Sequence, residues 1–566
     1  MKTNKKQNLM WVSLTKIFSP NVISESMVSL GNSIELPALF RKLGFRLLAA
    51  SFPRRVNFTS RLSFLYKFAA YLFTMVRHHG AEYTVNYLKS CQLAVQKAMA
   101  GQPVTSLRKI SPDRPLPRMA SCGLPSIIPL GDRKMILAGI PSICRWWLTI
   151  FSIYRVIKLP AAAMKLKTST ITDPFTGSVD KLKGVNEAIP IVMGRTFLAT
   201  FRFKPSSSGS LLFLETSSPT HAPSWVGVIN DLAALQYRGL YRHLKVCAEK
   251  LFHPNGLLLG MEVVTNYLSA MKLVGRKESD VRKDGSKDLS SLASEAPVGQ
   301  LSLKEEAAGK VRVFAMVDVW TQSILKPMHD HLFSILKHIP NDGTFDQRAA
   351  VRRCFAKAAQ FNCSYGFDLS AATDRLPIDL QVEVVSFLYG REFALAWKSL
   401  LVDREYVLCS DGKRGLVKEN IVLKYAVGQP MGALSSWAML ALTHHLIVQL
   451  AFLRTPGLKT EKWFEGYELL GDDIVIFNKT VADSYLILCD QLGVSINLGK
   501  SVIAEKKPMF EFAKVTGLNG VDVSAISWKM FISQNTLMGR ANIVFSLLGR
   551  EIVKGQPFEW IKNIVK

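Results

Sequence analysis

The sequence predicts an α+β or α/β catalytic region that follows a largely helical, basic N-terminal region. From Gly309 onward, short β-rich apolar runs alternate with helical stretches, and carboxylates lie in the tight turns between them. Before residue 165, helical segments with basic faces are interrupted by proline-rich breaks. The 566 residues are 48% apolar and 20% charged, which suits several folded units or one multi-lobed enzyme.

The charge of the chain is strongly positive and unevenly distributed. The net charge is +27, and residues 1–200 hold 28 basic and 8 acidic side chains, against 43 and 36 in residues 201–566. This excess predicts a polyanionic partner, either nucleic acid or an anionic membrane surface. The eight cysteines form no C-x-x-C pair, which disfavours a zinc site or a disulfide framework and favours a reducing compartment.

The most apolar run is Met135–Tyr154, MILAGIPSICRWWLTIFSIY. It contains Pro141 and Arg145, and a membrane span would have to bury that arginine at a cost of about 3 kcal/mol. We therefore expect a buried or interfacial helix here. Membrane contact is the alternative, because Trp146 and Trp147 beside the arginine would also suit a membrane interface.

The first motif with chemical potential is SYGFDLSAATDRLP. Tyr365–Leu369 is predicted as a buried strand with Asp368 at its exit, and Pro377 opens a helix over Ile378–Tyr389. A strand, a loop and a helix in this order place Asp368 and Asp374 near one face. A turn followed by a helix cap is the alternative interpretation of the same residues.

The second motif is YELLGDDIVIFN, in which apolar runs flank Gly471, Asp472 and Asp473. This pattern predicts a two-stranded hairpin with an acidic tip, although a solvated turn would look the same. Neighbouring carboxylates between apolar strands repel each other, and a bound cation would relieve that repulsion. Asp368 and Asp472, each at a strand end, could hold two Mg²⁺ ions that support an in-line phosphoryl displacement. This is nucleotidyl-transfer chemistry.

The third motif, VGQPMGALSSWAMLALTHH, lies between the first two. Gly428 and Gly432 allow close backbone approach, and Ser435 and Ser436 start an apolar helix that runs to Leu446. A glycine-rich loop that opens a helix suits a ribose, a phosphate or a template backbone. Ordinary helix packing and a membrane signal are the alternatives. The two histidines of this motif are expected as polar residues at the end of the helix rather than as ligands.

Four cations are further candidates. Lys310 and Arg312 alternate with apolar residues, so they share one face of a predicted strand and could hold a triphosphate. A solvated edge strand is the alternative. Lys500 and Lys514 follow the acidic hairpin and are candidates for contact with pyrophosphate and with a growing strand, although exposed lysines are common.

In this order the motifs resemble the palm of a viral RNA-directed RNA polymerase. The wording is most similar to the mitovirus polymerases, relatives of the narnavirus and levivirus enzymes, in the segments GKVRVFAMVDVWTQSILKPMHDHLF, IPNDGTFDQ, FDLSAATDRLP, GQPMGALSSWAMLALTHH and LLGDDIVIFN. The resemblance is strong over about residues 300–530, looser over the preceding 130 or so, and says little about residues 1–165. It implies an α+β right-hand fold with fingers, palm and thumb.

The resemblance also implies a division of the chain. We expect a basic N-terminal region at 1–165, fingers at 166–360 with a polar loop at 277–295, a palm with a finger insertion at 361–530, and a thumb or C-terminal segment at 531–566. The last segment is short for a thumb. We therefore expect a minimal thumb, an N-terminal lobe that closes the channel instead, or a shortened family member.

The family's catalytic roles pass to matching positions. Asp368 is similar to the first metal-binding carboxylate, Asp472 to the second, and Asp473 to an auxiliary one. Asp374 resembles the carboxylate that senses the ribose 2′-hydroxyl of the incoming nucleotide. Lys500 lies where some polymerases keep a general acid for the leaving pyrophosphate.

Binding roles pass in the same way. Lys310 and Arg312 resemble the finger cations that hold the triphosphate. The template- and ribose-contacting loop corresponds to Gly428, Gly432, Ser435 and Ser436, and the template channel to Gly343 and Thr344. Many RNA polymerases place an Asn in the helix after the glycine loop, but none occurs here before His445. Ribose selection is therefore expected to rest on Asp374 and a serine.

The resemblance implies an RNA-directed RNA polymerase that copies a positive-strand viral RNA genome from ribonucleoside triphosphates with Mg²⁺ or Mn²⁺. It implies a host mitochondrial location, template and product RNA as partners, the mitochondrial membrane surface as a further candidate partner, and no protein partner. A reverse transcriptase is one alternative, but its hairpin usually carries an aromatic residue where Leu470-Gly471 stands here. An inactive, basic RNA-binding or membrane-associated endogenised relative is the other, and the ordered carboxylates argue against it.

Overall fold

The computed structural model describes most of the chain between residues 47 and 556. Within that range it leaves out 49, 53–57, 105–114, 116, 158, 160–163, 165, 207–208, 210, 213–214, 254–259, 267–295, 411–416, 458–461, 533–536 and 554. The polar loop expected at 277–295 lies outside the described residues, as do parts of the regions expected at 1–165 and 531–566.

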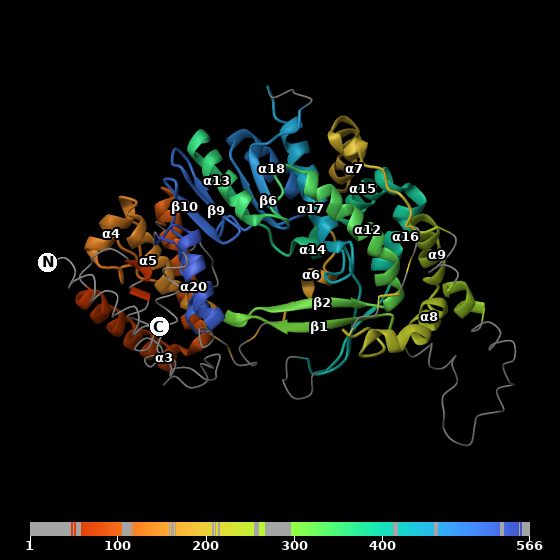
Figure 1. Cartoon of the computed structure of the whole chain (residues 1–566), viewed down its shortest axis with the longest axis horizontal. Coiled ribbons are helices and arrows are strands. Elements are labelled where there is room, and N and C mark those ends of the chain that lie inside the picture. The colour runs from red at the N-terminus through yellow and green to blue at the C-terminus, as the bar shows by residue number, and fades with distance from the viewer. Residues whose placement is uncertain are drawn as a thin grey trace, which may run out of the picture.

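Three sheets and a larger number of helices alternate along the described chain, which confirms the α+β class (Figure 1). The first sheet has the order β2-β1-β4-β5, with β1 at Gly299–Glu305, β2 at Val311–Val317, β4 at Tyr406–Leu408 and β5 at Ile421–Leu423. The second has the order β6-β7-β3-β8, with β6 at Tyr467–Leu470, β7 at Asp473–Ile476, β3 at Ser364–Asp368 and β8 at Val502–Ala504. The third has the order β11-β10-β9, with β9 at Met509–Phe512, β10 at Val515–Leu518 and β11 at Val521–Asp522.

The helices whose bounds lie fully within the described residues fall into two groups. Those up to residue 251 are α3 (Phe58–Met99), α4 (Leu130–Leu137), α5 (Pro141–Phe151), α6 (Ser169–Thr172), α7 (Val179–Arg195), α8 (Val228–Tyr237) and α9 (Tyr241–Leu251). Those that follow β2 are α12 (Val319–His338), α13 (Gln347–Phe361), α14 (Ala372–Arg375), α15 (Ile378–Tyr389), α16 (Arg391–Val402), α17 (Ser436–Leu453), α18 (Lys479–Gln491), α19 (Trp528–Ile532) and α20 (Leu537–Gly549).

The second sheet, β6-β7-β3-β8, is buried on both faces, and we call it the central sheet. Ile474 and Ile476 of β7 face a core built with α17 and α18. Val475 and Phe477 face a smaller cluster with α13 and β9. Because side chains of a strand alternate between the two faces, a continuous apolar run is what a strand covered on both sides needs. The run IVIF after the acidic turn therefore belongs at the centre of a covered sheet.

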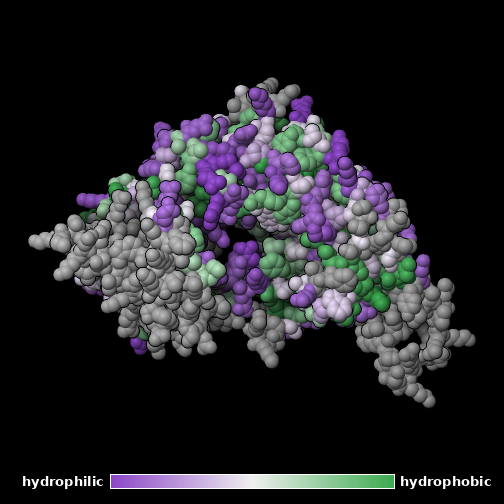
Figure 2. Space-filling view, in the orientation of Figure 1, coloured by the Kyte–Doolittle hydropathy of each residue, from purple (hydrophilic) through white to green (hydrophobic). Residues whose placement is uncertain are grey.

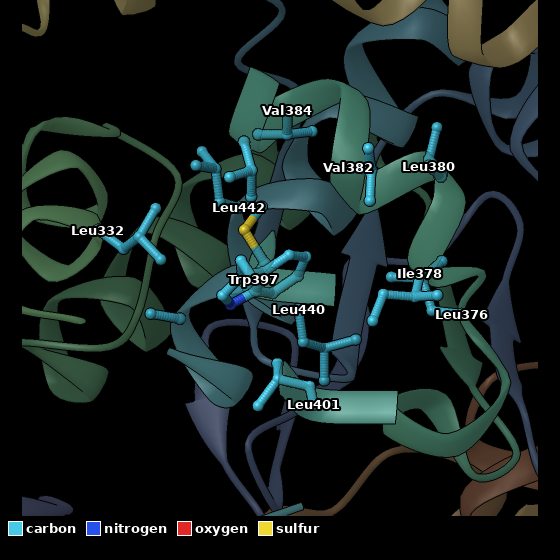
Figure 3. Packing of buried hydrophobic residues seen from close by; sticks show 14 of the residues in the cluster. Leu332, Leu376, Ile378, Leu380, Val382, Val384, Trp397, Leu401, Leu440 and Leu442 are labelled. Atoms are coloured by element: carbon cyan, nitrogen blue, oxygen red, sulfur yellow. The ribbon is translucent and has the colours of Figure 1, made fainter. Parts of the chain in front are cut away.

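The largest core lies where α12, α15, α16 and α17 meet. Trp397 of α16 is fully buried, and Figure 3 shows it surrounded by Leu332, Leu401, Leu440 and Leu442. Helix α17 is apolar around its whole circumference, and neighbouring elements cover it on nearly all sides. It is the one described helix with the length and apolarity of a membrane span, and 89% of its residues are buried inside the protein.

The apolar run Met135–Tyr154 contributes to a different core. It folds as α4 and α5, which meet at a 117° bend, and its centre is buried. Arg145 is buried with it and donates a hydrogen bond from Nη2 to the Asp522 carbonyl oxygen (2.7 Å). The expected buried helix is confirmed, as two short helices rather than one, and the carbonyl partner explains how the arginine is accommodated.

The described N-terminal and C-terminal parts share one hydrophobic core. Its members run from Leu47 to Leu159 and from Val502 to Val553. In Figure 1, α3, α4 and α5 lie beside α20 on the left of the molecule. The indole of Trp528 donates a hydrogen bond to the Thr149 carbonyl oxygen (2.6 Å), which links the two parts inside this core. We call this unit the terminal lobe.

The β1–β2 ribbon connects the two sides of the molecule. At its turn, the Ala308 amide donates to the Ile157 carbonyl oxygen (2.9 Å), and Lys89 Nζ donates to the Ala308 carbonyl oxygen (3.3 Å). Both partners belong to the terminal lobe. Figure 2 shows a hollow at the centre of this face, above the ribbon, with hydrophilic residues above and below it and hydrophobic residues at its sides. The terminal lobe thus helps to enclose the hollow.

A buried charge network fixes the end of β2 on the helices. Arg404 is fully buried and donates to Asp318 Oδ2 (2.8 Å) and to the Val298 carbonyl oxygen (2.9 Å). Asp231 lies beside Asp318, and its Oδ2 accepts from the Val319 amide (3.2 Å). Burial, with the neighbouring Asp318 charge, raises the pKa of Asp231 above its ordinary value of 3.8.

This raised pKa predicts a pH effect on stability. A carboxyl group whose folded pKa is raised favours the folded state when protonated, so its contribution is lost as pH rises from about 4 through the raised value. The free energy of unfolding should therefore fall less between pH 5 and pH 8 in Asp231→Asn than in the wild type. Chemical denaturation at the two pH values measures this difference, and the exposed Asp330→Asn is the control for net charge. An identical fall in all three proteins would contradict the prediction.

Candidate active site

The register of the central sheet brings the acidic motifs together. In the antiparallel pair β3–β7, Asp368 lies opposite Asp473, and in the pair β6–β7 Leu470 lies opposite Asp473. Residues directly opposite in such a pair have Cα atoms only about 4.5–5.5 Å apart. Asp472 occupies the turn between β6 and β7. Asp368 and Asp472 are exposed, whereas Asp473 is half-buried. The predicted strand exit and the predicted hairpin therefore meet at one end of one sheet.

The turn itself requires glycine. Gly471 has φ +64°, in the left-handed region, and a Cβ at this position would lie 3.2 Å from Nε1 of Trp437. Its carbonyl oxygen is held from behind by His444 of α17, whose Nδ1 lies 2.8 Å away. Since a carbonyl can only accept, His444 donates from Nδ1, and its Nε2 accepts from the Tyr485 hydroxyl (2.7 Å). Burial lowers the pKa of His444 to about 4, so this support is neutral.

His445, the next residue of α17, makes a second pair of contacts. Its Nε2 lies 3.1 Å from Asp342 Oδ2, and its Nδ1 lies 2.7 Å from the Tyr467 hydroxyl. The position expected for both histidines, at the end of the helix, is wrong. Helix α17 continues to Leu453, and both side chains are buried within it. The residues beyond Leu446 are apolar except for Gln449, and that was the signal that the helix continues.

Negative charge accumulates at the turn. Burial raises the pKa of Asp473 to about 7, and Glu511, Asp472 and Asp368 add to the shift. The Ala513 amide donates to Asp473 Oδ2 (2.9 Å) and offsets part of it. Burial and Asp368 also raise the pKa of Glu511. Four carboxyl groups thus act on one another here.

A divalent cation suits this charge distribution. Among the described residues, no three His, Cys, Asp or Glu side chains are arranged to hold a metal ion by themselves. Asp368 and Asp472, both exposed, would therefore hold Mg²⁺ or Mn²⁺ together with water or phosphate oxygens, which is the coordination that Mg²⁺ favours. A cation fits this site because it would relieve the mutual repulsion of the carboxylates.

One cation of the chain already lies at the site. Lys500 Nζ is 3.4 Å from Asp368 Oδ2. The loop that carries it is tied to the strand end, because the Asn497 amide donates to the Asp368 carbonyl oxygen (2.9 Å). From the terminal lobe, Lys97 Nζ donates to the carbonyl oxygens of Ser501 (2.9 Å) and Leu498 (3.3 Å) on either side of Lys500.

Asp374 is positioned by the glycine loop. The Gly428 amide donates to the Asp374 carbonyl oxygen (2.9 Å), and a Cβ on Gly428 would lie 2.2 Å from the Thr373 carbonyl oxygen. Asp374 Oδ2 accepts from Thr170 Oγ1 (2.8 Å), and burial raises the pKa of Asp374. Neither α14 nor α15 has a side-chain cap, so Asp374 does not serve as the helix cap of the alternative interpretation.

The second glycine of the loop packs on β2. Gly432 has φ +121°, and a Cβ there would lie 2.4 Å from the Ala315 carbonyl oxygen. The Ala315 amide donates to the Met431 carbonyl oxygen (2.6 Å). Gln322 of α12 donates to the Gly432 carbonyl oxygen (3.1 Å) and accepts from the Leu434 amide (2.8 Å). The loop is thus clamped on both sides.

The two serines are buried in this structure. Ser435 has φ 76°, and its Oγ accepts from the indole Nε1 of Trp397 (3.0 Å). Its amide donates to Nδ1 of His329 (3.2 Å). Ser436 is also buried, and its hydroxyl has no hydrogen-bond partner among the described residues. Both hydroxyls therefore face the protein, and a nucleotide contact from either would need the loop to rearrange.

The structure does not bring the predicted triphosphate cations to the carboxylates. Arg312 Nε pairs with Glu306 Oε1 (2.6 Å), and Lys310 is exposed at the turn end of the ribbon. The ribbon touches the glycine loop at Ala315, five residues beyond Lys310, or about 17 Å of extended chain. Both cations lie toward the turn end of the β1–β2 ribbon, and Arg312 is paired with Glu306 rather than with a carboxylate of the acidic turn.

The remaining predicted residues flank the hairpin. The Gly343 amide donates to the Leu469 carbonyl oxygen of β6 (2.8 Å), and Thr344 follows it. Lys514 is exposed in the two-residue turn between β9 and β10, with φ 65°, next to Ala513 with φ 51°. Since Ala513 also bonds Asp473, this strained turn is attached to the acidic one.

Sequence reasoning missed several residues of the site. Glu511 lies in the strand FEF, where nothing in the pattern separates it from an ordinary strand carboxylate. Glu468 of β6 is fully buried and pairs with Arg353 (2.7 Å) and Lys357 (2.6 Å) of α13. An apolar strand with one charged residue, beside a helix with cations at i and i+4, was a usable signal for that cluster.

Comparison with known proteins identifies relatives. A model of the mitovirus RNA-dependent RNA polymerase family matches residues 203–561. The RNA-directed RNA polymerase of Cryphonectria parasitica mitovirus 1 is 33% identical over 490 residues, which make up 84% of this chain and 55% of that protein. An uncharacterised mitochondrial protein of Arabidopsis thaliana is 36% identical over 214 residues, 38% of this chain and 82% of that one. A solved structure described as an RdRp complex has a TM-score of 0.49 at 9% identity, over 92% of this chain and 47% of that chain. The chain thus spans about half the length of the viral polymerase.

The support behind the turn predicts a coupling between two side chains. His444→Phe removes the donor to Gly471 and the acceptor for Tyr485, and each unpaired buried group costs about 1–3 kcal/mol of unfolding free energy. Tyr485→Phe should therefore destabilise the wild type more than it destabilises His444→Phe. Chemical denaturation of the four proteins of this double-mutant cycle measures the coupling. Additive losses would mean that the two side chains do not interact.

Proposed function

Because the chain belongs to the mitovirus RNA-dependent RNA polymerase family, we propose that it is an RNA-directed RNA polymerase that replicates a positive-strand viral RNA genome. The observation that carries the proposal is the register that sets Asp368 opposite Asp473, next to Asp472 in the turn. The substrates are ribonucleoside triphosphates, and the partners are template and product RNA. The net charge of +27 supports a polyanionic partner.

The metal-binding role falls to Asp368 and Asp472, with Asp473 as an auxiliary group. When bound there, Mg²⁺ or Mn²⁺ would stabilise the attacking and leaving oxygens of the displacement. Asp473 supports the turn through its bond with the Ala513 amide. Burial raises the pKa of Asp473, and the neighbouring carboxyl groups add to that shift.

Lys500 is proposed to give a proton to the leaving pyrophosphate. Its ammonium group lies 3.4 Å from Asp368, so it is within reach of phosphates that approach that carboxylate. Lys97 holds the carbonyl groups on both sides of Lys500 and limits the movement of its loop. Lys514, exposed in the neighbouring turn, is proposed to contact the product strand.

The other predicted contacts, with the triphosphate, the template and the nucleotide, involve the β1–β2 ribbon, the segment before α13 and the glycine loop. Lys310 and Arg312 are proposed to meet the triphosphate as it approaches along the ribbon, and Arg312 must then leave Glu306. Gly343 and Thr344, next to β6, are proposed to line the path of the template. Gly428 and Gly432 shape the loop on which Asp374 rests, and Ser435 and Ser436 would contact the nucleotide only after a change in that loop.

The location is proposed to be the host mitochondrion. The names of the similar proteins support it, since one is a mitovirus polymerase and another a mitochondrial protein of a plant. Contact of the basic N-terminal region with the mitochondrial membrane surface is part of the same proposal. The run Met135–Tyr154 contributes little to it, because its described core is buried in the protein.

Removal of one metal ligand tests the proposal directly. Asp472→Asn should lower RNA synthesis by about 10³-fold or more in Mg²⁺, because a lost ligand costs several kcal/mol of transition-state stabilisation. Extension on a defined RNA template with ribonucleotides measures it. Asp379→Asn, which changes an exposed carboxylate of α15, is the matched control.

Two outcomes would contradict the assignment. Near-normal synthesis by Asp472→Asn would exclude its role in metal binding. A wild-type chain that binds RNA but extends nothing with either ribo- or deoxyribonucleotides would be an inactive relative. Extension with deoxyribonucleotides alone would indicate a reverse transcriptase.

Sugar choice gives a second prediction. Asp374 accepts a hydrogen bond from a ribose 2′-hydroxyl in this proposal, and a deoxyribose removes that bond from the half-buried carboxylate, whose Oδ2 already accepts from Thr170. Asp374→Ala should therefore lower the preference for a matched ribonucleotide over its deoxyribonucleotide about ten- to a hundredfold. The ratio of kcat/KM values for the pair is the measurement.

Thr170→Val is the matched control for this test. It removes the hydroxyl that donates to Asp374 Oδ2 but keeps the carboxylate, so discrimination should persist. A ratio that stays constant in Asp374→Ala while overall activity falls would show that this residue only supports the turn against Gly428.

A further inference from the structure

Three aromatic side chains form a continuous cluster beside the acidic turn. Phe333 of α12 stacks on Trp437 of α17, with ring centroids 5.7 Å apart and an interplanar angle of 15°. Phe333 also meets Phe345 edge to face, with centroids 6.0 Å apart. Trp437 is 39% exposed and Phe345 is 55% exposed. We call these three residues the aromatic cluster.

The cluster is tied to the hairpin at two points. The indole of Trp437 lies against Gly471, where a Cβ would come within 3.2 Å of Nε1. Phe345 follows Gly343, whose amide is bonded to the Leu469 carbonyl oxygen of β6. The exposed rings therefore border the turn that carries Asp472.

The exposure of these rings is informative. Burying a large aromatic side chain is favourable, yet Trp437 on α17 and Phe345 in the turn before α13 both stay open to solvent. A planar ring that stays open beside a polar site suits a planar ligand. Nucleobases stack on such rings with any sequence, because every base has a π-face.

Cations continue the surface away from the turn. Arg348 and Arg352 are exposed one helical turn apart on α13, which begins two residues after Phe345. Arg352 has a loose contact of 3.9 Å with Asp346, and both side chains are mostly exposed. Aromatic rings for bases next to arginines for phosphates are the combination that binds single-stranded nucleic acid. A protein or lipid partner would not need to lie against the acidic turn.

We propose that Trp437 and Phe345, with Phe333 packed between them, form a base-stacking surface for the single-stranded RNA template as it approaches the acidic turn. This proposal rests on the proposed polymerase function and assigns a template contact to aromatic residues of the motif segments that have no role in the proposal so far. Phe333 fixes the two exposed rings relative to each other. Arg348 and Arg352 would hold the phosphates of the same strand.

The test is the binding of a short single-stranded RNA that contains 2-aminopurine to the full chain, without nucleotides or metal. Trp437→Ala and Phe345→Leu should each weaken binding about 5- to 100-fold and reduce the quenching of the fluorescent base. Trp437→Phe and Phe345→Tyr keep a ring and should bind nearly as the wild type does. Trp225→Leu, at an exposed tryptophan elsewhere on the chain, is the control.

Salt dependence separates stacking from phosphate contact. The slope of log K against log salt should stay unchanged in Phe345→Leu, because no charge is lost, and should become shallower in Arg348→Gln. Phe345 lies in an exposed turn, so its leucine variant tests the proposal even if Trp437→Ala does not fold. Wild-type affinity and wild-type quenching in Phe345→Leu would overturn the proposal.

A second readout separates the template from the incoming nucleotide. If Trp437→Ala and Phe345→Leu bind RNA normally but raise the KM for ribonucleotides, the rings stack on the nucleotide and the template assignment is wrong. Failure of the polymerase function itself would look different. If the wild-type chain makes no RNA, the polymerase proposal is wrong. If the variants then still bind RNA more weakly than the wild type does, the stacking surface remains supported.

Discussion

The pairing of β3 with β7 sets Asp368 opposite Asp473, and the positions of the other groups at the site follow from that register. A slip by one residue would turn Val475 and Ile476 toward the wrong cores. Because both faces of β7 are buried, such a slip would not expose apolar surface. It would instead move the side chains of β7 into the core on the opposite face, where they would clash with their new neighbours. The carboxylates can repel one another without moving apart, since the hydrophobic packing of their strands holds them in place.

The terminal lobe extends this constraint to the front of the site. Lys97 of α3 bonds the carbonyl groups that flank Lys500, and Arg155 offsets part of the charge around Glu511. The same lobe contacts the turn of the β1–β2 ribbon through Lys89 and Ile157. Residues from the two ends of the described chain therefore form one body that touches both the loop of Lys500 and the turn of the β1–β2 ribbon.

Local patterns predicted the elements that carry the site, and long-range contacts decided what the patterns could not. Helix α15 has the predicted bounds Ile378–Tyr389, because Pro377 and Gly390 are local signals that no tertiary contact overrides. The strands on both sides of Asp472 were likewise predicted from local signals in the sequence. The burial of Ser435 depends on Trp397, 38 positions away, and that contact leaves no mark in the motif itself. The shared core of the terminal lobe could not be predicted from the sequence either. Periodicity shows that a face is apolar, but it does not show which distant face covers it.

The conformation of the glycine loop shows how the site keeps a strained backbone in place. Ser435 has φ 76°, which costs a residue with a side chain about 1–3 kcal/mol. Trp397 and His329 each bond this residue, and Gln322 bonds the residues before it, so the strain is offset by contacts that a relaxed loop would lose.

The support that His444 gives behind the acidic turn is of a different kind, because it carries no charge. His444 is neutral with a pKa of about 4, and its partners are a carbonyl and a hydroxyl. It can position the turn but cannot balance its carboxylates. Compensation must therefore come from the open side, where Lys500 lies and where substrate and cations would arrive.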